Sequence, residues 1–93
     1  MDDRESTQLL QAHLEGYRRR SYGDLAALRG RTHVAELRGA SGHAYQVEVE
    51  VRWDGAPGGP IRVLGAIDDG GLRSVKPISQ DFILSPDGTF VGE

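Results

Sequence analysis

From Tyr45 to Asp54 the sequence alternates strictly between apolar and polar side chains. Successive side chains of a β-strand point to opposite faces of a sheet, so this alternation indicates a strand with one apolar face and one polar face. The apolar residues are Tyr45, Val47, Val49, Val51 and Trp53. The segment therefore predicts a sheet that is buried on one face.

Residues 1–30 carry a helical pattern instead. Leu10, Leu14 and Tyr17 lie at helical spacing and would form an apolar stripe along one helix. Residues 18–20 are arginines, and positive charge is favourable in the last turn of a helix. Ser21 is a good N-cap for a second, short helix, which Gly30 would end. We therefore expect one or two helices in residues 1–30.

After residue 31 the pattern changes to that of strands. We expect strands at Thr32–Arg38, Ala44–Asp54, Ile61–Asp68 and Leu72–Lys76, and a short last strand at Thr89–Val91. Pairing Leu37 with Tyr45, and Ala35 with Val47, would keep the apolar residues of the first hairpin on one face. The strands would then follow one another as an antiparallel meander.

The third expected strand is apolar on both of its faces. Leu64 and Ala66 fall on the face opposite to the one that continues the buried side of the sheet. The dipeptide Asp69-Gly70 is typical of a two-residue hairpin turn, which would place Leu64 opposite Val75. One layer of helices covers only one face, so the second face needs a cover of its own.

Three covers for the second face stay open, namely the C-terminal tail, a partner protein and a ligand. The apolar residues of the tail are Ile78, Phe82, Ile83, Leu84, Phe90 and Val91. The tail is the first expectation, because an uncovered leucine or valine forgoes about 1.5–3 kcal/mol of burial. If a partner protein or a second copy covers the face instead, the interface would include Leu64, Ala66 and Val75.

These elements together predict an α+β fold, with one or two N-terminal helices packed on a largely antiparallel meander sheet of four to five strands. We expect residues 1–93 to form a single domain, with a helical segment at 1–30 and the sheet and C-terminal tail at 31–93. In layout this arrangement resembles the cystatin-like and NTF2-like folds. Many functions occur on such layouts, so the resemblance implies a fold and no particular activity.

Composition excludes several classes of function. Charged residues make up 27% of the chain and the formal net charge is -3, whereas nucleic acids and anionic membranes attract proteins with excess positive charge. The chain has no cysteine, so it can form neither disulfides nor a thiolate zinc site. The first residues are acidic and lead into no apolar run, so we expect no secretory signal, and the sequence contains no run of about 20 apolar residues. We expect a soluble cytoplasmic protein that binds no nucleic acid, no membrane and no cofactor.

The histidines are His13, His33 and His43, and no two of them show a spacing typical of metal ligands. His13 lies in the helical stripe and His33 on the core side of the first strand, so these two could meet. The carboxylates of Asp68 and Asp69 lack the ligand spacing of a calcium loop. The sequence therefore predicts no metal site.

Glu48 and Glu50 share the polar face of one strand, and paired carboxylates are typical of glycoside hydrolases. Here they stand on a regular strand beside arginines, so we interpret them as partners in cross-strand ion pairs. The arginines concerned are Arg38, Arg52, Arg62 and Arg73. Because no nucleophile–base pattern is present elsewhere, we predict no catalytic residue.

Trp53 ends the alternating strand beside the loop of residues 55–60, which is rich in glycine and proline. It either fills the core or lines a pocket between helix and sheet, where aromatic side chains often hold small ligands. The residues of such a ligand-binding pocket would be Trp53, Tyr45, Tyr17, His13 and His33.

Three functional classes are compatible with these features. The first is a non-enzymatic protein-interaction module, including a homodimer, that uses the second face of the sheet. The second is a small-ligand binder that uses the aromatic pocket. The third is a small enzyme that uses His13, His33 and a carboxylate such as Asp54 or Asp68. The third strand, apolar on both faces, favours the first class.

Overall fold

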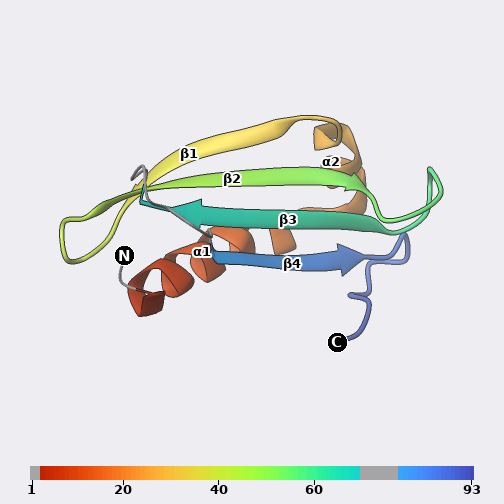
Figure 1. Ribbon diagram of the computed structural model, residues 1–93. Helices are drawn as coiled ribbons and strands as arrows, with labels where there is room; N and C mark the ends of the chain where they lie inside the picture. The colour runs from red at the N-terminus through yellow and green to blue at the C-terminus, as the bar shows by residue number, and fades with distance from the viewer. Residues whose placement is uncertain (1–2, 70–77) are drawn as a thin grey trace.

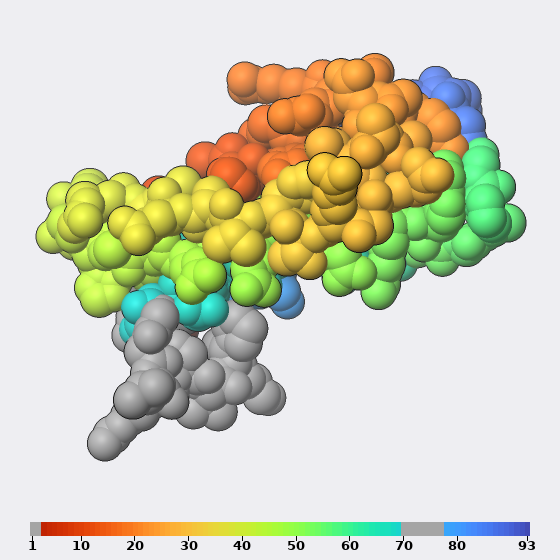
Figure 2. All heavy atoms as spheres, turned by 90° about the horizontal axis from the view of Figure 1, so that it is seen from above, coloured from red at the N-terminus to blue at the C-terminus, as the bar shows by residue number. Residues whose placement is uncertain are grey.

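The computed structural model describes residues 3–69 and 78–93. Within them, two helices precede four strands, bounded as α1 Asp3–Arg18, α2 Tyr22–Leu28, β1 Thr32–Arg38, β2 Ala44–Trp53, β3 Ile61–Asp68 and β4 Ile78–Leu84. The strands form an antiparallel sheet in the order β1-β2-β3-β4 (Figure 1). Both helices pack on the same face of this sheet (Figure 2). The predicted α+β class, with helices on an antiparallel meander, is confirmed.

The helices follow the sequence features that predict them. Leu10 and Leu14 form the buried stripe of α1. The hydroxyl of Ser21 caps α2 by accepting a hydrogen bond of 3.1 Å from the N–H of Asp24. Gly30 follows α2 with a φ of +83°, a conformation that favours glycine because it has no Cβ atom. The stripe, the cap and the glycine therefore account for where α1 and α2 lie.

The first hairpin has the predicted register. Leu37 lies opposite Tyr45, and Ala35 lies opposite Val47. Along β2, buried residues alternate with exposed polar ones, and the side chain of Val49 at its middle is 0% exposed. A shift of one residue would turn this whole apolar set to solvent, so the alternation determines both the buried face and the alignment of the two strands.

The fourth strand is not the one predicted from the turn signal. Leu64 of β3 lies opposite Asp81 of β4, so the predicted pairing of Leu64 with Val75 is wrong. The connection between β3 and β4 spans residues 69–77, which is too long for the predicted two-residue turn. Val75 and the predicted strand Leu72–Lys76 lie outside the described residues.

The observed pairing of β3 has a physical reason. It places Phe82 and Leu84 on the helix-covered face, where each is only 3% exposed. Burial of each such side chain stabilises the fold by about 1.5–3 kcal/mol. The carboxyl end of β3 therefore connects to the segment that adds Phe82 and Leu84 to the core.

The C-terminal tail does not cover the second face, and the expectation that it does is wrong. Residues 78–84 form the edge strand β4, in which Ile83, next to the last residue, is the apolar residue that turns to the second face. Phe90 packs edge-on against Phe82, with ring centroids 5.7 Å apart. The short strand expected at Thr89–Val91 is a single bridge between Leu84 and Phe90. The tail therefore strengthens the helix-covered side.

Gly65 of β3 allows α1 to pack closely on the sheet. A Cβ atom at this position would lie 2.9 Å from Cδ1 of Leu10 and 2.9 Å from Cδ2 of Leu14. Carbon atoms at optimal contact are about 3.5–4.0 Å apart, so a side chain here would force the two leucines to move. The stripe of α1 therefore rests directly on the backbone of β3.

Candidate functional site

The face of the sheet that the helices leave uncovered is the candidate functional site, and we call it the open face. It is formed by the side chains of β1–β4 that alternate with the core residues, and its apolar members are Val34, Ala44, Leu64, Ala66 and Ile83. Leu64 and Ala66 belong to the interface expected from the sequence, whereas Val75 lies outside the described residues. The described part of the expected interface thus lies on one strand, β3, with both side chains on the open face.

Apolar side chains of the open face remain accessible. Val34 is 58% exposed, and Leu64 and Ala66 are half-buried. A hollow of about 250 Å³ lies between the strands here, lined by Thr32, Glu48, Glu50, Leu64, Gly65, Ala66 and Ser79. Its lining thus combines small and apolar residues with the carboxylates of Glu48 and Glu50.

Glu48 has no cationic partner within the described chain. Its cross-strand neighbours on the open face are Val34 and Ala66, which are both apolar. Glu50 forms an ion pair of 3.5 Å with Arg52, two residues further along the same strand. The predicted cross-strand ion pairs of these two glutamates are therefore wrong for the residues that the structure describes. The open face instead presents an unneutralised carboxylate beside apolar surface.

Arg62 of β3 is engaged at one end of the open face. Its Nε–H donates to Oδ1 of Asp54 at 2.8 Å, and its Nη1–H donates to Asp81. The hydrogen bond to Asp54 is the main cause that raises the pKa of Arg62, and the charges of both carboxylates add to it. Arg62 is thus directed away from Glu48, and Arg73 lies outside the described residues.

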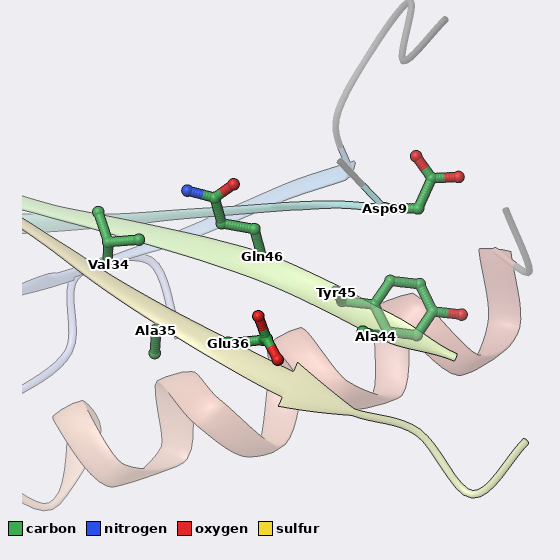
Figure 3. A pocket seen from close by; sticks show the side chains of 7 residues that line it. All are labelled: Val34, Ala35, Glu36, Ala44, Tyr45, Gln46 and Asp69. Atoms are coloured by element: carbon green, nitrogen blue, oxygen red, sulfur yellow. The ribbon is translucent and has the colours of Figure 1, made fainter. Parts of the chain in front are cut away.

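A second hollow of about 380 Å³ borders the edge strand β1 where β1 and β2 approach their hairpin (Figure 3). The residues that line it are Val34, Ala35, Glu36, Ala44, Tyr45, Gln46 and Asp69. Figure 3 shows Val34 and Gln46 on one side of the strands and Ala35 on the side of the helix. The hollow therefore extends over β1, β2 and the end of β3, and it adjoins the open face.

The residues of the predicted aromatic pocket do not gather in one place. Tyr45 and Trp53 stand at opposite ends of β2, about 27 Å apart along a regular strand. The ring of Trp53 lies 6.5 Å from that of Tyr22, and the guanidinium of Arg29 lies 5.1 Å from its centroid. The ring of Tyr45 instead lies 4.9 Å from that of His43. A ligand-binding role for these aromatic residues stays a prediction.

His13 and His33 have different partners. The ring of His13 lies 5.8 Å from that of Tyr17, and burial lowers the pKa of His13. Nε2 of His33 lies 3.2 Å from the carbonyl oxygen of Leu28, at the end of α2. The role of this histidine pair in catalysis or ligand binding stays a prediction.

Two further properties concern residues 3–69 and 78–93 as a whole. No three side chains of histidine, aspartate or glutamate there are grouped so as to hold a metal ion. None of the helices in this part of the chain is long and apolar enough to cross a membrane.

The sequence analysis missed a cation–aromatic cluster at the end of α1. The guanidinium of Arg18 lies 4.8 Å from the ring centroids of both Phe82 and Phe90. It also donates two hydrogen bonds of 2.7 Å to the carboxylate of Glu93, which lower the pKa of Glu93. The two charged residues are 75 positions apart, so no local pattern signals the contact. The cluster holds the last residues on the helix-covered side.

No known protein family, curated protein or solved structure matches this chain.

Proposed function

We propose that this chain is a non-enzymatic protein-interaction module that binds a partner protein through the open face of its sheet. The observation that carries the proposal is Val34, 58% exposed, directly opposite Glu48, a carboxylate with no ion pair in the described chain. Leu64 and Ala66 extend the apolar surface across β3. A partner that covers these residues gains their burial, whereas the helices of this chain are committed to the other face.

The exposed carboxylates of the open face indicate which kind of partner surface would fit it. Glu36, Glu48 and Glu50 are all exposed on this face. A complementary surface would present aliphatic side chains to Val34 and Leu64 and cationic side chains to the glutamates. Arg52 and Arg62 on this face are already ion-paired with acidic residues of the same chain, so the carboxylate of Glu48, which forms no ion pair in the described chain, favours a different, basic protein over a second copy of the same face.

A small-molecule binder is the second candidate. The hollow of about 380 Å³ beside β1 is within the size range of small-ligand sites and includes the ring of Tyr45 among its lining residues. It ranks second because the aromatic residues expected to converge on a ligand are distributed along β2. A small enzyme is the third candidate. The cytoplasmic location of the protein also stays a proposal.

The test compares wild-type protein with Leu64→Arg and with Gln8→Arg, an exposed substitution on α1. Proteins cross-linked to the wild type in source cells are purified and titrated against all three forms by isothermal calorimetry. We expect Leu64→Arg to weaken binding by about 30-fold or more. The new guanidinium would replace an apolar contact with the partner and would be repelled by the cationic side chains of that partner. Gln8→Arg should leave the affinity unchanged, and added salt should weaken wild-type binding.

A purified partner that binds Leu64→Arg as tightly as wild type would rule out the open face as its binding surface. Thermal melting of the two variants decides whether a loss of binding is local. Because Leu64 is half-buried and not in the core, we expect both variants to melt as a folded protein does.

A further inference from the structure

Within residues 3–69 and 78–93, the peptide groups on the outer edge of β1 pair with no other strand. The N–H of Gly39 donates to the carbonyl oxygen of His43, so these residues form a bonded pair in the β1–β2 hairpin. Bonded and non-bonded pairs alternate along an antiparallel ladder, and β1 pairs with β2 without a bulge. Counted back from Gly39, every second residue therefore forms its backbone hydrogen bonds with β2, and the peptide groups of the residues between them point away from β2. The residues whose N–H and C=O groups point outward are Thr32, Val34, Glu36 and Arg38.

The two edges of the sheet differ in protection. Edge strands are commonly guarded by proline, lysine, a bulge or a covering segment. Thr32–Arg38 contains neither proline nor lysine, and Figure 2, which views the molecule from the side of β1, shows this yellow strand uncovered along much of its length. At β4, in contrast, the N–H of Val91 donates to the carbonyl oxygen of Ile83. The C-terminal residues therefore occupy part of the β4 edge, and β1 is the free edge.

The sequence of β1 is self-complementary in one antiparallel register. If two copies of β1 are aligned around a two-fold axis through Ala35, Val34 of each copy lies opposite Glu36 of the other. Thr32 of each copy then lies opposite Arg38. All the outward peptide groups of both strands are paired in this register, and no like charges stand directly opposite each other. Ala35, which meets its own copy at the axis, is small enough for this close pair.

Neighbouring registers are less favourable. An axis through Glu36 would place the two Glu36 carboxylates opposite each other, which is destabilising. An axis through Val34 would place Arg38 opposite Gly30, whose N–H already donates to the carbonyl oxygen of Val51. The register centred on Ala35 is therefore preferred on both charge and hydrogen bonding.

We propose that two copies of this chain associate through β1, antiparallel and centred on Ala35, so that the two four-stranded sheets become one continuous sheet. The two-fold axis places both helical layers on the same side, so the two open faces form one larger surface. The pairing uses the edge of the sheet and not its open face. It therefore goes beyond the proposed function, and either proposal can fail without the other.

The first experiment removes one outward N–H. Proline at an outward-facing position of an edge strand takes no hydrogen bond from the β1–β2 ladder, so Val34→Pro should fold with the circular dichroism spectrum of the wild type. We expect wild-type protein to sediment as a dimer at high micromolar concentration. Val34→Pro should raise the dimer dissociation constant by about 30-fold or more, because each copy loses a bond and gains a clash. Val34→Thr, which keeps the N–H, should dimerise as wild type does.

The second experiment tests the register. The chain has no cysteine, so a single introduced thiol can react only with that of another copy. In Ala35→Cys the two thiols meet at the axis, with Cβ atoms about 4.5–5.5 Å apart, and should form a disulfide-linked dimer rapidly under mild oxidation. Ser79→Cys, exposed on β4, is the matched control and should cross-link slowly.

The outcomes separate the two proposals. Dimeric wild type, monomeric Val34→Pro and rapid cross-linking of Ala35→Cys together support pairing through β1. A wild-type protein that stays monomeric at millimolar concentration overturns it, as does a dimer that Val34→Pro leaves intact. If Leu64→Arg dissociates that dimer instead, the copies meet through their open faces, and the proposal of a basic partner on that face fails as well.

Discussion

On the helix-covered face of the sheet, side chains such as Val49 and Val63 are 0% exposed and pack under Leu10 and Leu14. On the open face of the same strands, Val34 is 58% exposed and its cross-strand neighbour is a glutamate. The alternation that builds the first face also produces the second, because every strand residue belongs to one or the other. The comparison teaches that the core of this chain is complete on one side of the sheet, which leaves the other side available for binding.

The largest expected difference between the faces concerns a buried charge. Val49→Asp places a carboxylate in the core without a partner, so we expect it to lower the free energy of unfolding by at least about 4 kcal/mol and to unfold the domain. Val34→Asp, the same change on the open face, should cost less than about 1 kcal/mol. Urea denaturation at low protein concentration measures both. Equal losses at the two positions would mean that the faces are not distinct.

A pair of adjacent residues in β3 gives the next largest effect. Gly65→Val would push into Leu10 and Leu14, and overpacking of this kind costs about 1–3 kcal/mol. Ala66→Val adds its methyl groups on the open face, beside the hollow of about 250 Å³, and should change the unfolding free energy by less than about 0.5 kcal/mol. Thermal or urea unfolding of both variants checks the difference. A fully tolerated Gly65→Val would show that α1 does not rest on β3 as closely as described.

The smallest expected effect is a pH dependence on the helix-covered side. Burial lowers the pKa of His13 in the folded protein, so the unfolded chain takes up this proton first as the pH falls through the ordinary value of 6.5. The titration of His13 therefore leaves the free energy of unfolding at its full value above pH 6.5 and lowers it as the pH falls below 6.5. His13→Gln should therefore reduce the loss of melting temperature between pH 7.5 and about pH 5.5. An unchanged pH profile in His13→Gln would contradict the effect of burial.

The parts of the fold that sequence predicts are those governed by local patterns. The strict alternation in β2 determines its buried face, and Ser21 and Gly30 mark the limits of α2 because caps and left-handed glycines act within a few residues. The register of the first hairpin follows as well, since one shift would expose every valine of β2. Local chemistry is sufficient for these features.

The partner of β3 could not be predicted in the same way. Asp69 and Gly70 carry a strong local turn signal, but the pairing is decided by the burial of Phe82 and Leu84, which lie far along the chain. In β4 the half-buried Gln80 interrupts the apolar alternation, so its strand pattern is weak in the sequence. Burial of these two side chains outweighed the local turn signal. The wrong prediction of the strand that follows β3 also led to the wrong expectation that the C-terminal tail covers the open face.

The candidate site was predictable only in part. The open-face position of Leu64 and Ala66 follows from strand parity alone. The lack of an ion pair at Glu48 does not, because Arg62 could have turned toward it and instead binds Asp54 and Asp81. Which arginine pairs with which carboxylate depends on side-chain geometry, which a one-dimensional pattern does not contain.

Accessibility of the two faces can be measured directly on methyl-labelled protein with a soluble paramagnetic agent such as a gadolinium chelate. We predict strong relaxation enhancement for the methyl groups of Val34 and close to none for those of Val49, which lies on the neighbouring strand with its side chain on the opposite face. Methyl groups of Val34 that are as protected as those of Val49 would show that another layer covers the open face, and would contradict the one-sided core on which the proposed function depends.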